Sequence, residues 1–106
     1  GTDVLGYWHD IGHGQLRQNL GFINQERWLE RLSPLLLGMH LHDVAPPAQD
    51  HLMPPRGQID FSRLKRFAKP SILKVIEPAP DMPVEDIRGG LEFFKRVWGD
   101  EEVVDG

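Results

Sequence analysis

The sequence predicts an α/β domain with a parallel sheet, because short apolar strands alternate with amphipathic helices along the chain. The pattern of strand, polar loop and helix occurs three times. A strand–helix–strand order makes consecutive strands parallel, with right-handed crossovers. The length of 106 residues, with 40% apolar residues, suits one domain. We therefore expect a parallel (βα)3 unit over residues 1–99, followed by an acidic C-terminal tail over residues 100–106.

Three strands are predicted from alternating side chains, at residues 4–10, 36–42 and 72–77. Pro78 ends the third strand sharply. In each strand one face combines small or apolar residues with a titratable residue near the end, and we expect this face to point into the core. It consists of Gly6, Trp8 and Asp10 in the first strand, Leu36, Gly38 and His40 in the second, and Leu73, Val75 and Glu77 in the third.

Apolar residues at helical spacing predict three helices, over residues 24–33, 60–68 and 83–98. Asn24 and Asp60 are the expected N-caps of the first two helices. Gly12 and Gly14 argue against a helix directly after the first strand, since glycine disfavours helix. The segment 43–59 is a long loop, and loops of this length in compact domains are usually functional or disordered.

Composition and charge narrow the range of functions. Twelve Lys and Arg against sixteen Asp and Glu give a net charge of −4, which disfavours a nucleic-acid partner, because phosphate binding needs clustered basic residues. With no cysteine, any metal would be bound by His and carboxylate groups. The sequence contains no apolar run of membrane-spanning length and no signal-peptide pattern, so we expect a cytoplasmic protein without a membrane partner.

The residues at the strand ends predict a metal site. Functional groups of parallel α/β folds gather at the carboxyl ends of the strands, and here those positions hold Asp10, His40 and Glu77. Two carboxylates and an imidazole suit Mn²⁺, Zn²⁺, Co²⁺ or Mg²⁺. The alternative for any one of these residues is a purely structural hydrogen bond. His9 faces away from Asp10 and is left out, whereas further polar groups follow in the loops, namely His13, His42, Asp43, Asp50 and His51.

Four segments together resemble a known family. They are Asp10-Ile11-Gly12-His13, Gly38-Met39-His40-Leu41-His42-Asp43, the stretch that begins Asp50-His51-Leu52-Met53-Pro54-Pro55-Arg56-Gly57, and Val75-Ile76-Glu77. In order and spacing these segments resemble the last three βα units of the xylose isomerase-like TIM barrels. That superfamily includes the sugar phosphate isomerases and epimerases and the endonuclease IV type of AP endonuclease (family 2). The resemblance implies the C-terminal part of such a barrel, incomplete as a single chain.

The resemblance also implies a role for each matching residue. Asp10 and His40 would bind a divalent metal, and Glu77 would bind it and act as one of two acid–base carboxylates. His13 and His51 would contact the substrate or a second metal. Strands one to five of the barrel have no counterpart here, and with them the other acid–base carboxylate.

Two loop positions depart from the family pattern. Gln49 stands where the endonucleases carry an acidic residue, with Asp50 displaced by one position, which disfavours their trinuclear zinc site. Arg56 replaces part of a Pro-Gly-Glu-Gly run. Its charge suits an anionic group such as a sugar phosphate, and the alternative is a solvated surface arginine.

Three functional hypotheses follow. The first is a metal-dependent isomerase or epimerase that acts on a sugar or sugar phosphate by abstracting a proton next to a carbonyl. The second is phosphodiester hydrolysis of the endonuclease IV kind, and the third is a non-catalytic, oligomerising truncated barrel. A three-stranded parallel sheet leaves edges and one apolar face open, so we expect a homo-oligomer or the remainder of the same barrel to cover them.

Overall fold

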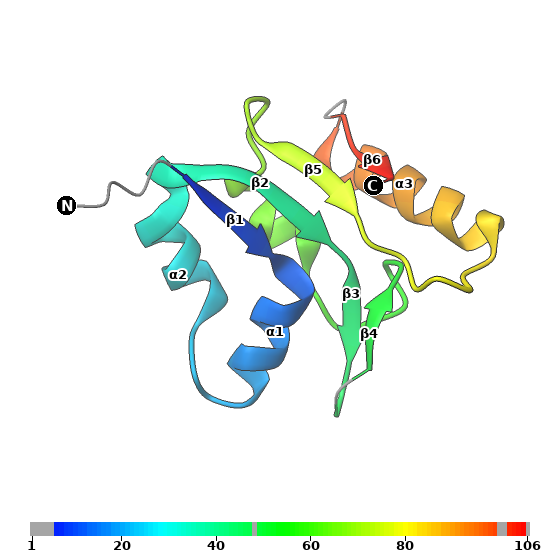
Figure 1. Cartoon of the computed structure of the whole chain (residues 1–106), viewed down its shortest axis with the longest axis horizontal. Helices are drawn as coiled ribbons and strands as arrows, with labels where there is room; N and C mark the ends of the chain where they lie inside the picture. The colour runs from blue at the N-terminus through cyan, green and yellow to red at the C-terminus, as the bar shows by residue number, and fades with distance from the viewer. Residues whose placement is uncertain (1–5, 48, 100–101, 106) are drawn as a thin grey trace.

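The computed structural model describes residues 6–47, 49–99 and 102–105 and contains a four-stranded parallel sheet flanked by helices (Figure 1). The strand order is β1–β2–β5–β6, and all pairings are parallel. This architecture confirms the predicted α/β class with a parallel sheet. The strands are β1 (Tyr7–Asp10), β2 (Leu36–Leu41), β5 (Leu73–Ile76) and β6 (Val104–Asp105).

The other elements form the connections between these strands. The helices are α1 (Ile11–Asn19), α2 (Gln25–Leu32) and α3 (Val84–Trp98), with the 3₁₀ helices η1 (Ser33–Leu35) and η2 (Phe61–Phe67). Strands β3 (Asp43–Ala45) and β4 (Gln49–Leu52) pair as an antiparallel hairpin within the predicted long loop. Among the described residues, none of the helices has both the length and the hydropathy that crossing a bilayer requires.

The core lies between the sheet and the helices. Met39, Leu41 and Ile76 point from the sheet into it and are fully buried. From the helical side, Phe94 and Trp98 of α3 pack against Phe61 of η2, and the Trp98 indole N–H donates to the Phe61 carbonyl at 2.8 Å. These contacts fix α3 against η2, and the buried strand residues belong to the same core.

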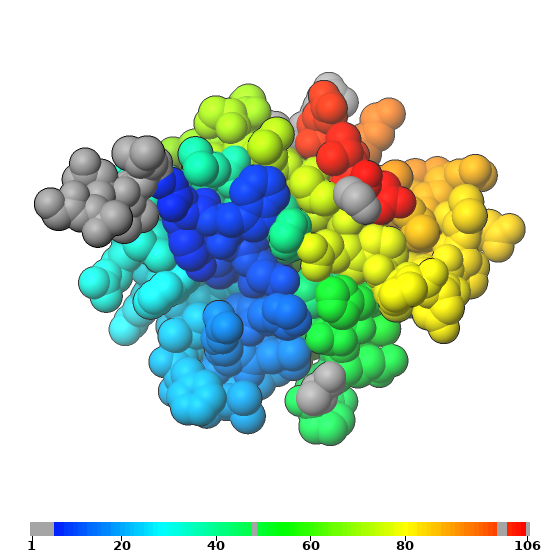
Figure 2. Space-filling view, viewed as in Figure 1, coloured from blue at the N-terminus to red at the C-terminus, as the bar shows by residue number. Residues whose placement is uncertain are grey.

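The other face of the sheet is open, and the prediction that it points into a core is wrong. Trp8 is 41% exposed and Leu73 61% exposed, while His40 is partly exposed. In the space-filling view no helix covers this face of β1 and β5 (Figure 2). Leu36 and Gly38 are exceptions, because both are buried, Gly38 beneath the Trp8 ring. Alternation identifies residues that share a face, but the side on which the helices pack decides which face is buried. The titratable strand ends therefore lie on the open side.

Helix α1 occupies a segment that was predicted to be a loop because of Gly12 and Gly14. A Cβ at Gly12 would overlap the His42 ring, and a Cβ at Gly14 would overlap the Gln25 side-chain oxygen. Each glycine costs helix stability of about 1 kcal/mol relative to alanine. Here the two glycines let the helix approach buried polar groups, a tertiary requirement that local propensity does not register.

Several boundaries agree with the predictions. Asn24 caps α2 by accepting the Arg27 N–H, and Asp60 caps η2 by accepting the Ser62 N–H. Helix η2 is a 3₁₀ rather than an α helix. Residues 104–105 of the predicted acidic tail form β6 and pair with β5, which makes four strands instead of three. Positions 4–5 of the first predicted strand, and 100–101 and 106 of the tail, lie outside the described residues.

Candidate metal centre

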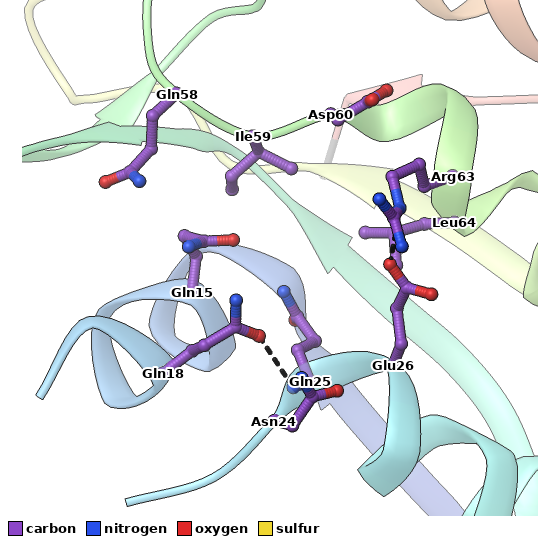
Figure 3. Close-up of a pocket in the computed structure, with 10 residues that line it drawn as sticks. All are labelled: Gln15, Gln18, Asn24, Gln25, Glu26, Gln58, Ile59, Asp60, Arg63 and Leu64. Carbon is purple, nitrogen blue, oxygen red and sulfur yellow. Dashed lines mark hydrogen bonds and ion pairs between the residues drawn. The ribbon is translucent and has the colours of Figure 1, made fainter. Parts of the chain in front are cut away.

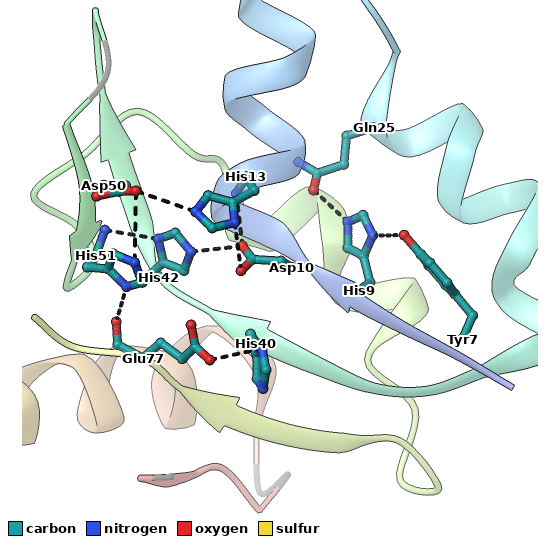
Figure 4. A network of polar contacts seen from close by, with 10 residues as sticks. All are labelled: Tyr7, His9, Asp10, His13, Gln25, His40, His42, Asp50, His51 and Glu77. Carbon is teal, nitrogen blue, oxygen red and sulfur yellow. Dashed lines mark hydrogen bonds and ion pairs between the residues drawn. The ribbon is translucent and has the colours of Figure 1, made fainter.

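The strand-end triad consists of Asp10, His40 and Glu77, which meet at the carboxyl end of the parallel strands (Figure 4). Asp10 is the last residue of β1 and lies in register with His40 of β2. The Glu77 N–H donates to the Leu41 carbonyl at 2.9 Å, which continues the β2–β5 ladder to this residue. One ligand atom from each of the three side chains lies within 4.8 Å of the other two. The structure thus brings the three predicted ligands together.

The triad is partly open to solvent and carries negative charge. His40 Nδ1 lies 2.9 Å from Glu77 Oε1, and each of these two side chains is about one-third exposed. Burial of Asp10 opposes its ionisation, but hydrogen bonds from His42 and from the His13 backbone N–H outweigh burial and lower the pKa of Asp10 to about 2. Asp10 is therefore ionised at any physiological pH.

His42 holds Asp10 in place and is fully buried. Its Nδ1 accepts the His51 backbone N–H at 3.0 Å, so its Nε2 carries the proton and donates to Asp10 Oδ1 at 2.8 Å. Because both ring nitrogens are used, His42 positions Asp10 and is not itself a ligand. At the level of sequence, His42 is only one of several polar residues in the loop. The sequence feature that could have identified its positioning role is its place two residues after His40.

A second convergence involves His13, His51 and Asp50. His13 Nδ1 lies 3.1 Å from Asp10 Oδ2, and its Nε2 lies 3.4 Å from Asp50 Oδ2. His51 donates from Nδ1 to the Glu77 carbonyl at 3.0 Å, and its Nε2 lies 3.8 Å from the same Asp50 oxygen. Nε2 of His13 and Nε2 of His51 therefore both face the same Asp50 oxygen. Two imidazole nitrogens and a carboxylate grouped in this way are ligand types that a divalent cation accepts.

The backbone at His51 supports both groups. His51 has a φ of 54°, in the left-handed region that non-glycine residues seldom adopt. Its N–H bonds to His42 and its ring bonds to the Glu77 carbonyl, and these two bonds hold the residue in that conformation. Such backbone conformations concentrate at functional sites.

Two charged loop residues lie apart from this arrangement. Arg56, predicted to meet an anionic substrate group, is 65% exposed and pairs with Asp86 of α3 at 2.9 Å. Asp43 is fully buried and accepts the backbone N–H groups of Val44, Gly57 and Ile59. Asp43 therefore organises the long loop and takes no part in the triad.

Cavities flank the strand-end triad on two sides. One of about 480 Å³ is lined by His51, Glu77, Pro78, Pro80, Met82 and Ile87, among others. Another of about 420 Å³ is lined by Trp8, Asp10, His13, Arg17 and Trp28, among others. Both are large enough for a small-molecule ligand next to the converging side chains.

Comparisons with protein-family models, with curated proteins and with solved structures find no match to this chain. The chemistry of the site is therefore argued from its own donor set. Two carboxylates and an imidazole, grouped within 4.8 Å, match the oxygen and nitrogen ligands of Mn²⁺, Zn²⁺, Co²⁺ and Mg²⁺. The residues present fit a divalent cation.

Proposed function

We propose that this chain carries the metal site and one catalytic carboxylate of a metal-dependent isomerase or epimerase for a sugar or sugar phosphate. The observation that supports this most is the convergence of Asp10, His40 and Glu77 from three neighbouring strands. A cavity of small-molecule size adjoins Glu77. The resemblance to the xylose isomerase-like barrels adds the reaction class and the substrate class.

Asp10, His40 and Glu77 would hold the divalent cation, with Asp10 oriented by His42. When bound, such a cation polarises a carbonyl oxygen of the substrate and so acidifies the neighbouring C–H group. The ionised Asp10 carboxylate contributes a permanent negative charge to this site.

Glu77 is the group that would move the proton. His40 Nδ1 lies 2.9 Å from Glu77 Oε1, and among the described residues Oε2 has no hydrogen-bond or ion-pair partner. The free oxygen can take a proton from the carbon next to a carbonyl, while the contact with His40 keeps the carboxylate oriented. A positioned base of this kind contributes about 10²–10⁴-fold to the rate. Return of the proton on the opposite face requires a second acid–base group, which a further strand or subunit would supply.

The open face of the sheet also requires a further structural element to cover it. Trp8, whose ring centroid lies 5.2 Å from that of His40, and Leu73, at the start of β5, are both exposed on this face. An exposed apolar sheet face is typical of an interaction surface. We propose that the remainder of a barrel or a second copy of the chain covers it. Light scattering at micromolar concentration tests the second copy, and a monomer with a cooperative melt excludes it.

The first test is metal binding, measured as thermal stability with and without Mn²⁺. An ion at 100 times its Kd stabilises the folded state by about 2.7 kcal/mol. We expect the melting temperature of the wild type to rise and that of His40→Ala to stay constant. Glu92→Gln, an exposed carboxylate of α3, is the matched control and should retain the shift. A wild-type melting temperature independent of Mn²⁺, Zn²⁺, Co²⁺ and Mg²⁺ contradicts the proposal.

The second test is solvent deuterium incorporation into ketoses and ketose phosphates. Because one proton-transfer group is present, the chain by itself should give slow exchange, about 10²–10⁴-fold faster with Glu77 than with Glu77→Gln. That variant keeps the shape of the side chain and removes the base. Glu92→Gln is again the control and should keep the wild-type rate. Exchange that survives Glu77→Gln would assign the base elsewhere.

Phosphodiester hydrolysis is the second candidate, supported by the convergence of His13, Asp50 and His51. These residues would hold a second cation close to the first, as two-metal hydrolases require. Asp50 provides the carboxylate that Gln49 lacks, since it lies 3.4 Å from His13 and 3.8 Å from His51. Cleavage of a synthetic phosphodiester that disappears in Asp50→Asn, without deuterium exchange into ketoses, would favour this function over isomerisation.

A further inference from the structure

A separate pocket lies between α1, α2 and the segment that leads into η2 (Figure 3). Its volume is about 250 Å³, and it shares no lining residue with the candidate metal centre. Amide side chains dominate its walls, whereas Ile59 and Leu64 supply the apolar part. The amides are those of Gln15, Gln18, Asn24, Gln25 and Gln58.

A chain of hydrogen bonds orients Gln25 at this pocket. The Trp28 indole N–H donates to the Tyr7 hydroxyl at 2.8 Å, and that hydroxyl lies 2.8 Å from His9 Nδ1. His9 Nε2 lies 2.7 Å from Gln25 Oε1. An amide oxygen only accepts, so His9 donates from Nε2 and accepts from Tyr7 at Nδ1. Burial lowers the pKa of His9, which keeps the ring in this neutral form.

These hydrogen bonds leave the amide nitrogen of Gln25 directed into the pocket, as Figure 3 shows. Gln25 is only 3% exposed, and within the described part of the molecule its Nε2 has no hydrogen-bond partner. The described residues contain no fully enclosed polar side-chain atom that lacks a partner, so this nitrogen is reached from the pocket itself. A nearly buried donor that opens only into a cavity is expected to bind an acceptor there.

The charges at the pocket rim are already engaged. Glu26 pairs with Arg63 at 2.7 Å and with Arg66 at 3.2 Å. Asp60 accepts from the N–H and hydroxyl groups of Ser62. What remains for a ligand is a set of uncharged amides. Glu26 and Asp60 outnumber Arg63, the one cation among the described lining residues, so the rim is unfavourable for an anion.

We propose that this pocket binds a small, uncharged, polyhydroxylated compound of the polyol or monosaccharide class. Among the described residues, the side-chain nitrogens of Gln18 and Gln25 and the side-chain oxygen of Gln15 have no partner, so the walls offer both donors and an acceptor. A hydroxyl group requires this combination. The Gln25 N–H, held by His9, fixes the position of one hydroxyl or ring oxygen. The small apolar area contributed by Ile59 and Leu64 disfavours a hydrophobic ligand, and the volume disfavours a nucleotide.

The experiment is a titration of the ¹⁵N-labelled chain with sorbitol in the presence of EDTA, which keeps the metal centre empty. We expect saturable shifts of the side-chain amide signals of Gln15, Gln25 and Gln58. D-Gluconate, a carboxylate of the same chain length, should bind at least tenfold more weakly. Equal or tighter binding of gluconate would overturn the assignment to an uncharged ligand, and the absence of saturable shifts with sorbitol would overturn the site.

Three variants locate the binding. Gln25→Glu keeps the oxygen to which His9 donates and removes the amide donor, so sorbitol should bind about tenfold more weakly. Gln58→Ala, on an exposed residue whose amide also bonds Asn19, should weaken binding about fivefold, the value of one neutral hydrogen bond. Gln49→Ala, an exposed glutamine of β4 outside the pocket, is the matched control. If Gln25→Glu does not fold, the affinity of Gln58→Ala for sorbitol decides whether this pocket is the binding site. An affinity for sorbitol unchanged from wild type in Gln58→Ala refutes the proposal.

Discussion

The strand-end triad and the buried His42 behind it differ in how much of their bonding capacity the protein itself uses. His42 is completely enclosed, and both of its ring nitrogens are bonded, to His51 and to Asp10. His40, two residues earlier, is about one-third exposed, and among the described residues its ring nitrogens have one polar partner, Glu77. His42 also lies within 4.8 Å of His13 and His51. Proximity to other histidines therefore does not identify a metal ligand by itself. A residue can bind a metal only if it keeps a lone pair that no hydrogen bond within the protein uses.

The largest expected difference between these regions is in stability. His42→Ala leaves a cavity and unpairs the buried His51 N–H, so we expect the free energy of unfolding to fall by about 2–4 kcal/mol. His40→Ala removes a partly exposed contact and should cost less than about 1 kcal/mol. Urea unfolding of the two variants measures both values. Equal losses would mean that His40 is as structural as His42.

A second comparison uses two glycines in helices. A methyl group at Gly12 meets the His42 ring, so Gly12→Ala should destabilise the fold by about 1–3 kcal/mol. At Gly89 of α3 a methyl group meets nothing within 4 Å, and Gly89→Ala should stabilise by up to about 1 kcal/mol. Thermal unfolding followed by circular dichroism gives the sign of each change. A stable Gly12→Ala variant would show that His42 can move without consequence.

The third prediction concerns acid. The pKa of Asp10 in the folded chain is about 2, below its ordinary value of 3.8, so the unfolded chain binds the proton more readily. The stability that Asp10 contributes is present above about pH 4 and is lost as the pH falls toward 2. The loss amounts to about 2 kcal/mol. Asp10→Asn should flatten this part of the stability curve, whereas Asp81→Asn, on an exposed turn, should leave the curve unchanged.

Local sequence signals predicted much of the fold because they act over a few residues. Pro78 stops a strand, Asn24 and Asp60 cap helices, and alternation defined the strands that carry Asp10 and His40. The β3–β4 hairpin and β6 were not predicted, since strands of two to four residues are too short to show a period. Helix α1 was not predicted, because Gly12 and Gly14 make room for side chains that come from other parts of the sequence, among them His42.

For the candidate site, the sequence by itself determined the donor types and their grouping, because parallel strands bring their carboxyl ends to one edge. Asp10, His40 and Glu77 follow from that rule. Only the tertiary structure decided which groups remain free to bind a ligand. His42 is saturated, Asp50 meets His13 and His51, and Gln25 turns its amide into a pocket. Hydrogen-bond partners come from residues far apart in the chain, and a local pattern does not encode their directions.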